Sequence, residues 1–206
     1  MKEKLRDQYD SLYTAQDDVF GGGQPVEAVC QIKNYIDSGR VLDIGGGEGR
    51  NALYLAERGF RVSVNDLSKV GLDKIKLIAK EKGFTIDTRV ADVTEDTIEG
   101  EYEVILLTFV LHHMDKLEAV KVIKEAQKHT VIGGINVIET FVNKGGLYER
   151  NKVTGRFYPC QKEIEELYKD WDIKELSIKE IMTMARNKEG KPMKNHAVSL
   201  LAQKSR

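Results

Sequence analysis

The chain has 206 residues, of which 32 are basic and 33 acidic, so its formal net charge at pH 7 is −1. This balance excludes a strongly basic nucleic-acid binder whose affinity comes mainly from phosphate contacts, and we expect no nucleic-acid partner. A length of 206 residues fits one α/β domain, and three prolines are too few for a long linker. We therefore expect a single domain over residues 1–206.

The cysteines and the N-terminus bear on the compartment. Cys30 and Cys160 lie far apart and form no C-x-x-C pair, so cysteine alone provides neither a zinc site nor a redox dithiol. The charged N-terminus lacks the apolar core of a signal peptide, and no apolar run approaches the ~20 residues that cross a bilayer. We expect a cytoplasmic protein with reduced thiols, no metal site and no membrane contact.

The N-terminal part is expected to be helical. Residues 3–18 form a weakly amphipathic pattern that carries Tyr9 and Tyr13, and a glycine triplet then interrupts it. A second helical stretch follows over residues 25–36. We interpret residues 1–38 as a helical cap, whose two tyrosines either close over a ligand or only pack against other helices.

From residue 40 onward, short apolar runs alternate with helical stretches. The expected strands cover residues 40–44, 61–66, 85–91, 103–108 and 135–141, and the expected helices cover 51–58, 72–82, 117–129 and 161–171. Such alternation is typical of βαβ units, with helices on both faces of a parallel sheet. Two further strand-like runs, 172–181 and 196–203, flank a turn near Gly190 and predict an antiparallel hairpin. The fold class is therefore α/β, with a doubly wound, mostly parallel sheet that ends in a C-terminal hairpin.

The first expected strand ends in a glycine-rich turn. Residues 43–49 read D-x-G-x-G-x-G, and ligands of open parallel sheets bind beyond the carboxyl ends of the strands. Glycines let the backbone turn tightly and let a ligand approach closely. A dinucleotide fingerprint would place its third small residue at position 50, which is Arg50 here, one residue after Gly49. The spacing thus favours a nucleoside ligand without phosphate over a dinucleotide.

Two acids follow the next strands. Asp66 ends the second strand, where a carboxylate can accept hydrogen bonds from both ribose hydroxyls. Asp92 ends the third strand and could accept from an adenine amino group. Either acid alone is more often a helix cap or a solvated charge. Together with the glycine turn, they indicate a nucleoside site.

These features resemble the class I S-adenosylmethionine-dependent methyltransferases over nearly the whole chain. The segments that match their motifs are 41–49, 65–66, 91–93 and 107–114. Residues 49–56, which read G-R-N-A-L-Y-L-A, are similar to a segment of the small tellurite-resistance-type branch. Further similarity to that branch is found in Tyr9-Asp10-x-x-Tyr13, in Phe20-Gly21 with Pro25, and in residues 168–171. The resemblance implies a seven-stranded sheet, with S-adenosyl-L-methionine as the cofactor.

The same resemblance assigns the cofactor-binding residues. The glycine turn would pass under the methionine portion, and Asp43 would bond its amino group. Asp66 would hold the ribose, Leu67 would pack on the adenine, and Phe109 would close the floor near the sulfonium. Asp92 and the Val93 backbone would bind the adenine edge. The full set is Asp43, Gly45, Gly46, Gly47, Gly49, Asn51, Asp66, Leu67, Asp92, Val93 and Phe109.

The candidate catalytic residues are Arg50, His112, His113, Arg186 and His196. A neutral imidazole at either of the two adjacent histidines can orient a substrate or take a proton near pH 7, or it can merely hold its loop. The tellurite-resistance branch has a Glu-x-His-Arg-like segment between its last strands. Residues 181–186 read I-M-T-M-A-R, with a methionine in place of that histidine. We expect Arg186 to replace the arginine, and His196 resembles a histidine found at its place in other relatives.

Arg50 is expected at the start of the helix that follows the glycine turn. Its guanidinium can form a forked pair with an anionic acceptor, or with an acid such as Asp17 or Asp18. An arginine is slightly unfavourable at a helix N-terminus, by ~0.3–1 kcal/mol, so its position indicates a specific partner.

Three functions are compatible with these patterns. The first is methyl transfer from S-adenosylmethionine to a small molecule, such as a thiol, an oxyanion or a metabolite. The second is a non-catalytic S-adenosylmethionine-binding sensor or partner subunit, and the third is a nicotinamide oxidoreductase, against which Arg50 argues. No Asn/Asp-Pro-Pro-aromatic loop of nucleic-acid methyltransferases is present. We expect the first function, in a monomer or a homodimer, and the sequence leaves the acceptor open.

Overall fold

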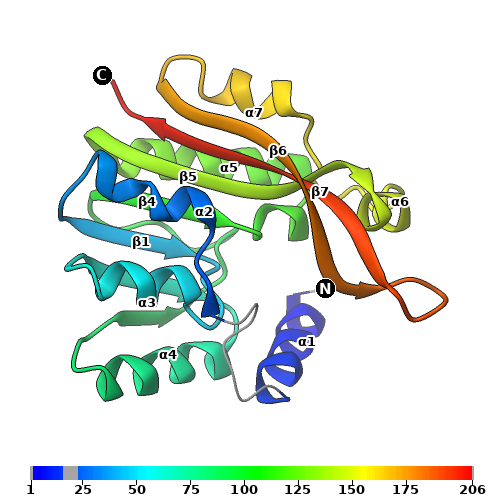
Figure 1. The fold of residues 1–206 in the computed structure, drawn as a ribbon, viewed down its shortest axis with the longest axis horizontal. Coiled ribbons are helices and arrows are strands. Elements are labelled where there is room, and N and C mark those ends of the chain that lie inside the picture. The colour runs from blue at the N-terminus through cyan, green and yellow to red at the C-terminus, as the bar shows by residue number, and fades with distance from the viewer. Residues whose placement is uncertain (1, 16–22, 206) are drawn as a thin grey trace.

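The computed structural model describes residues 2–15 and 23–205, apart from the side chain of Met184. A seven-stranded sheet with the order β3-β2-β1-β4-β5-β7-β6 forms its centre (Figure 1). The strands are β1 (Arg40–Ile44), β2 (Arg61–Asp66), β3 (Asp87–Val90), β4 (Tyr102–Thr108), β5 (Thr130–Gly145), β6 (Asp172–Arg186) and β7 (Pro192–Gln203). The first five are parallel, whereas β7 runs antiparallel to both β5 and β6. The predicted fold class and strand count are therefore confirmed.

Helices cover both faces of the sheet. The helices after the N-terminal region are α2 (Glu27–Cys30), α3 (Arg50–Ala56), α4 (Lys69–Glu81), α5 (Lys116–His129), α6 (Gly146–Asn151) and α7 (Gln161–Leu167), with short 3-10 turns η2 (Ile32–Asn34) and η3 (Leu111–His113). One apolar core joins α2, α3 and α4 to the sheet, and a second joins α5 and α7 to the opposite face. In Figure 1, α2 lies in front of the sheet and α5 behind it. No helix in the described part of the chain is long and apolar enough to span a membrane.

Two helices are shorter than predicted. The continuous helix expected over residues 25–36 is wrong, because the chain forms only α2 and then the single turn η2. This path buries Val29 and Ile32 completely against the sheet. The helix expected to reach residue 171 ends at Leu167, since Tyr168 turns inward and donates a hydrogen bond to Asn136 Oδ1 at 2.9 Å.

The region after β4 differs most from expectation. β5 continues to Gly145, beyond the predicted end at residue 141, and leads directly into α6, which the sequence patterns do not predict. Gly145 has a φ of +104°, a conformation that favours glycine. The side chain of Asn195 on β7 accepts a hydrogen bond from Leu147 N at 2.6 Å and so fixes the start of α6.

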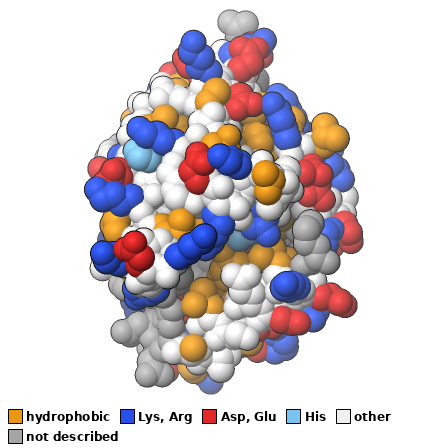
Figure 2. All heavy atoms as spheres, turned by 90° about the vertical axis from the view of Figure 1, so that its right-hand side faces the viewer, with side chains coloured by type: hydrophobic (Ala, Val, Ile, Leu, Met, Phe, Trp, Pro, Cys, Tyr) orange, Lys and Arg blue, Asp and Glu red, His pale blue; other side chains and the backbone are white. Residues whose placement is uncertain are grey.

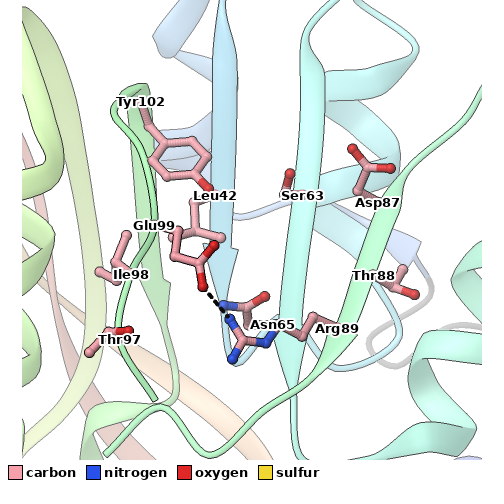
Figure 3. Close-up of a pocket in the computed structure, with 10 residues that line it drawn as sticks. All are labelled: Leu42, Ser63, Asn65, Asp87, Thr88, Arg89, Thr97, Ile98, Glu99 and Tyr102. Atoms are coloured by element: carbon pink, nitrogen blue, oxygen red, sulfur yellow. Dashed lines mark ion pairs between the residues drawn. The ribbon is translucent and has the colours of Figure 1, made fainter.

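The connection between β3 and β4 contains no helix, so part of one sheet face stays uncovered. A hollow of about 200 Å³ lies there (Figure 3). Arg89 and Glu99 point toward each other across it, with their charged atoms 3.8 Å apart. The residues that line the hollow are Leu42, Ser63, Asn65, Asp87, Thr88, Arg89, Thr97, Ile98, Glu99 and Tyr102. None of the glycines of the turn and none of the candidate catalytic residues is among them.

Candidate functional site

The glycine turn links β1 to α3 in a conformation that only glycine adopts without strain. Gly45, Gly47 and Gly49 have φ values of +69°, +57° and +80°. A Cβ on Gly45 would lie 2.4 Å from Val110 Cγ2, and one on Gly49 would lie 2.6 Å from Ile75 Cγ1. The turn is thus packed closely on both sides.

A further glycine, Gly71 in α4, packs directly against the backbone of this turn. A Cβ at Gly71 would lie 2.6 Å from the backbone oxygen of Gly47. In an ordinary helix interior, a Gly→Ala change stabilises by roughly 0.5–1 kcal/mol. Here we expect Gly71→Ala to destabilise by about 1–3 kcal/mol, because the backbone of the turn must move.

Chemical denaturation of Gly71→Ala and wild type measures this effect. A matched control is Lys76→Ala, an exposed position on the same helix, which should leave the free energy of unfolding nearly unchanged. A stabilised Gly71→Ala variant would contradict the close approach.

Asp43, the penultimate residue of β1, is a buried acid without a partner. Its side chain is 0% exposed, and neither carboxylate oxygen has a hydrogen-bond partner among the described residues. Burial raises the pKa of Asp43 to about 7, and the nearby Arg50 partly opposes this shift. A buried carboxylate without a partner is costly, and a ligand with an ammonium group would satisfy it.

Asp66 holds the glycine turn against the end of β2. Its Oδ2 accepts a hydrogen bond from Gly47 N, and its Oδ1 accepts one from Ser68 N, both at 2.8 Å. Burial raises the pKa of Asp66, although these backbone donors oppose the shift. Each oxygen keeps a further lone pair that can accept from a hydroxyl of a ligand.

Asp92 lies at the end of β3 and already has partners. Its Oδ1 accepts from Thr94 N at 3.0 Å and from Thr94 Oγ1 at 2.7 Å, and Lys2 Nζ lies 2.7 Å from its Oδ2. Burial alone would raise the pKa of Asp92, but the hydrogen bonds from Lys2 and Thr94 hold it below its usual value. The carboxylate is therefore anionic at neutral pH, and both of its oxygens already have partners in Lys2 and Thr94.

The N-terminal helix α1 (Lys2–Thr14) covers the carboxyl ends of several strands. Besides the contact of Lys2, Asp10 accepts a hydrogen bond from Ser68 Oγ, and the Tyr9 hydroxyl lies 2.9 Å from His113 Nε2. Tyr13 is only 7% exposed, and its hydroxyl lies 2.5 Å from where a Cβ of Gly47 would be. The tyrosines thus lie over the site, where one of the two sequence interpretations places them.

The two adjacent histidines follow β4 in η3. His112 is buried with its ring centroid 4.0 Å from that of His113 and 4.7 Å from that of Phe141. Burial, the neighbouring His113 and Arg156 lower the pKa of His112 well below its usual value. Burial and Arg156 lower the pKa of His113 to about 4. Both rings are therefore neutral at pH 7, and the Nδ1 atom of each is buried without a hydrogen-bond partner among the described residues.

Arg50 lies between two acids on the α3 face of the sheet. Its guanidinium carbon is 5.6 Å from the centroid of the Phe109 ring, and it has no ion-pair or hydrogen-bond partner among the described residues. Burial lowers the pKa of Arg50, and the carboxylates of Glu139 and Asp43 oppose this. Asp17 and Asp18, the predicted partners of Arg50, lie outside the described residues.

Glu139 lies in the middle of β5, opposite Thr108 at the end of β4, and is a candidate site residue that the sequence patterns do not indicate. Burial raises its pKa to about 7, opposed by Arg50 and Lys179. Its backbone oxygen accepts a hydrogen bond at 2.6 Å from the nitrogen of Phe109, which has a φ of +53°. Such a backbone is uncommon outside glycine, and strain of this kind clusters at functional sites.

An aromatic wall that the sequence patterns do not predict also belongs to this region. Phe141, Leu147 and Tyr158 form a small apolar cluster, against which Phe109 and Tyr148 pack. The Tyr158 hydroxyl accepts a hydrogen bond from Asn151 Nδ2 at 2.8 Å. These residues come from β5, α6 and the following loop, which lie far from the glycine turn in the sequence. The unusual density of tyrosine and phenylalanine at 141–158 is the only signal that could have indicated them.

Two other predicted site residues, Asn51 and Arg186, make contacts elsewhere in the protein. Asn51 is buried, accepts from Val26 N and donates to Thr108 Oγ1, both at 2.9 Å, so it joins α2, α3 and β4. Arg186 is exposed in the hairpin and donates to the oxygen of Gly190 at 2.7 Å, and no described contact joins it to the histidines.

Leu67, Val93 and His196 are half-buried. Leu67 and Val93 directly follow Asp66 and Asp92, whereas His196 lies on β7 opposite Glu180. Within the described ranges, no group of three or more histidine, cysteine, aspartate or glutamate side chains is arranged to hold a metal ion.

Comparisons with known proteins agree with this geometry. The family model of the tellurite resistance protein TehB matches residues 13–201. A probable S-adenosyl-L-methionine-dependent methyltransferase TehB from Haemophilus influenzae is 26% identical over 176 residues, which cover 85% of this chain and 61% of that relative. The chain thus spans about three fifths of the length of this curated relative.

Solved structures show the same fold. The crystal structure of TehB from Haemophilus influenzae superposes with a TM-score of 0.79 at 22% identity, over 95% of this chain and 67% of that one. A magnesium protoporphyrin IX methyltransferase from Synechocystis, solved with bound S-adenosylhomocysteine, gives a TM-score of 0.71 at 18% identity over 99% of each chain. The match of the family model over most of the sequence shows that the chain belongs to the TehB tellurite resistance protein family.

Proposed function

We propose that this chain is a methyltransferase that uses S-adenosyl-L-methionine and acts on a small-molecule acceptor. The observation that carries the proposal is Asp43, a buried carboxylate without a partner beside the glycine turn. Membership of the TehB family supports it, because the matched relative is named a probable S-adenosyl-L-methionine-dependent methyltransferase.

The residues present fit this cofactor. Asp43 would bind the ammonium group, and the methionine portion would lie along the backbone of the turn from Gly45 to Gly49, where the Tyr13 hydroxyl now packs against Gly47. Asp66 would accept from the ribose hydroxyls through its remaining lone pairs, and Asp92 would bind the adenine edge once Lys2 releases it. When bound, the cofactor supplies a methyl group activated on a sulfonium.

The acceptor would lie next to the histidines and the aromatic wall, which contact each other through His112 and Phe141. Phe109, Phe141 and His112 contact one another through their rings, and α1 lies over the glycine turn, an arrangement that would limit the access of water. Methyl transfer needs a nucleophile held ~3–3.5 Å from the methyl carbon, and most of the catalysis comes from this positioning. The neutral His113, already bonded to Tyr9, can hold a protic acceptor in place.

The outer surface also favours a small acceptor. Figure 2 looks onto the edge toward which β1 points, where basic and acidic side chains are interspersed with hydrophobic ones. A nucleic acid would require a continuous basic surface. A small molecule enclosed by α1 and the aromatic wall requires none.

Calorimetric titration with S-adenosylhomocysteine tests the cofactor assignment. We expect wild type to bind and Asp66→Ala to bind at least ~100-fold more weakly, a loss of about 2.7 kcal/mol. A matched control is Asp73→Ala, an exposed carboxylate on α4, which should bind like wild type. Absence of binding by wild type, or equal binding by Asp66→Ala, would contradict the proposal.

Turnover distinguishes the remaining functions. Release of S-adenosylhomocysteine should be measured with thiols, oxyanions and metabolite extracts as acceptors. Binding without turnover across this panel would indicate a non-catalytic sensor or partner subunit. Tighter binding of a nicotinamide dinucleotide than of S-adenosylhomocysteine would indicate an oxidoreductase.

A further inference from the structure

The strand β6 forms one edge of the sheet, and no strand of the described part of the chain pairs with its outer side. It is 15 residues long, and together with β7 it extends beyond the rest of the sheet as a curved hairpin (Figure 1). Such an edge presents unpaired backbone N–H and C=O groups to another chain, and proteins commonly shorten, bend or cover it. Here the pairing with β7 is regular between Glu175 and Thr183, without a bulge.

The sequence of this regular stretch is self-complementary when read antiparallel. Residues 175–179 read E-L-S-I-K. If two copies pair about a two-fold axis at Ser177, Glu175 of each copy faces the partner's Lys179, and Leu176 faces the partner's Ile178. Opposite charges and apolar pairs directly across an antiparallel ladder stabilise it, whereas like charges destabilise it. We propose that the outer edge of β6 is the interface of a homodimer, in which two copies of this chain pair antiparallel about Ser177.

The exposure of the side chains agrees with this register. Ile178 is 43% exposed, although it belongs to a strand whose neighbour on the same face, Leu176, packs against the core. In the dimer, the partner's Leu176 would cover Ile178. An exposed apolar residue at this place thus gains a specific partner.

The charged pair and the central serine give a second argument. Within one chain, the nitrogen of Lys179 lies 3.9 Å from a carboxylate oxygen of Glu175, and the two residues flank Ser177 on the same face. The hydroxyl of Ser177 is buried and has no hydrogen-bond partner among the described residues. If both charged side chains turn toward the partner, the two serine hydroxyls face each other and can bond to one another.

Charge exchange at the interface tests the proposal with the full chain. Wild type is expected to sediment as a dimer, and Lys179→Glu, which places Glu opposite Glu, should weaken self-association at least ~tenfold. The double variant Glu175→Lys/Lys179→Glu restores opposite charges and should restore the dimer. Lys188→Glu, the same charge change at the exposed hairpin turn, should leave the dimer intact.

Lys179 also contacts Glu27, so its replacement could affect the fold as well as the interface. A second variant is therefore needed whose effect does not depend on these charges. Residues opposite each other in an antiparallel pair have Cα atoms ~4.5–5.5 Å apart, which suits a disulfide. Mild oxidation of Ser177→Cys should therefore give a covalent dimer on a non-reducing gel, whereas Lys188→Cys and wild type should not. A wild type that stays monomeric at all concentrations, or a dimer that neither Lys179→Glu nor Ser177→Cys affects, would overturn the proposal.

Discussion

Replacing Asp43 by asparagine should make the free protein more stable and at the same time weaken cofactor binding. The carboxyl group is fully buried, and its pKa is raised from 3.8 to about 7. Keeping it ionised above pH 7 costs on the order of 4 kcal/mol, whereas a buried amide without partners costs ~1–3 kcal/mol. We therefore expect Asp43→Asn to raise the free energy of unfolding by ~1–3 kcal/mol at pH 8.

The raised pKa of Asp43 also makes the free energy of unfolding depend on pH. Between pH 3.8 and about 7, the folded chain holds a proton on Asp43 that the unfolded chain has released. The stability contributed by this group therefore falls as the pH rises through that window, and Asp43→Asn should remove this slope. Denaturation curves at several pH values measure it.

The affinity for the ligand should change with pH in the direction opposite to the stability of the free protein. A positive ammonium group needs the ionised carboxylate, so the affinity of wild type for S-adenosylhomocysteine should rise with pH and level off above about 7. Asp43→Asn should bind at least ~tenfold more weakly, about 1.4 kcal/mol, at every pH above that value. A destabilised variant would show that Asp43 has a stabilising partner in the free protein. A variant that binds as tightly as wild type would show that Asp43 does not bind the ammonium group.

The second large effect is expected at Arg50. Its guanidinium lies over Phe109, close to the buried Asp43 and the half-buried Glu139, and has no ion-pair partner in the described part of the chain. We expect Arg50→Ala to lower turnover at least ~tenfold, about 1.4 kcal/mol of barrier, because an anionic group of the acceptor loses its forked donor. The melting temperature should change little, since Asp43 and Glu139 can each take up a proton when the positive charge is removed.

The pH profile separates this role from a structural one. Without Arg50, the pKa of Asp43 and of Glu139 should rise further, so the rising limb of the activity profile should move to higher pH. Arg58→Ala is the matched control, since Arg58 lies just beyond the end of the same helix and stacks on Tyr54 at 3.5 Å. Full activity of Arg50→Ala would refute the role, and loss of the fold would make Arg50 a structural residue.

The sheet and the glycine turn could be predicted because their signals are local. A buried parallel strand reads as a continuous apolar run, and the turn after β1 requires glycine at positive φ, so both leave a pattern within ten residues. The positions of Asp66 and Asp92 at the ends of strands could be predicted for the same reason, because Asp66 is the last residue of β2 and Asp92 comes two residues after β3. Their partners Gly47 and Lys2 could not be predicted, since those contacts depend on how separate elements meet.

The acceptor side of the site leaves weaker local signals. Glu139 lies inside an apolar strand and reads as an ordinary exposed position, although its side chain is half-buried and close to Arg50. α6 begins at a glycine and depends on Asn195, which is distant in the sequence. Arg186 matches the position of the family's arginine only approximately, and in the hairpin it donates a hydrogen bond to the oxygen of Gly190. Tertiary contacts decide each of these placements.

The position of α1 has a kinetic consequence. Lys2, Asp10, Tyr9 and Tyr13 contact the ends of β1 to β3 and the loop after β4, so one rigid helix of 13 residues bridges four segments. With the nucleoside bound beside the glycine turn, as we propose, these contacts would have to break before it could enter or leave. Exchange of product for fresh cofactor would then wait for a single opening event, and this event, rather than methyl transfer, would limit the steady-state rate once both substrates are saturating.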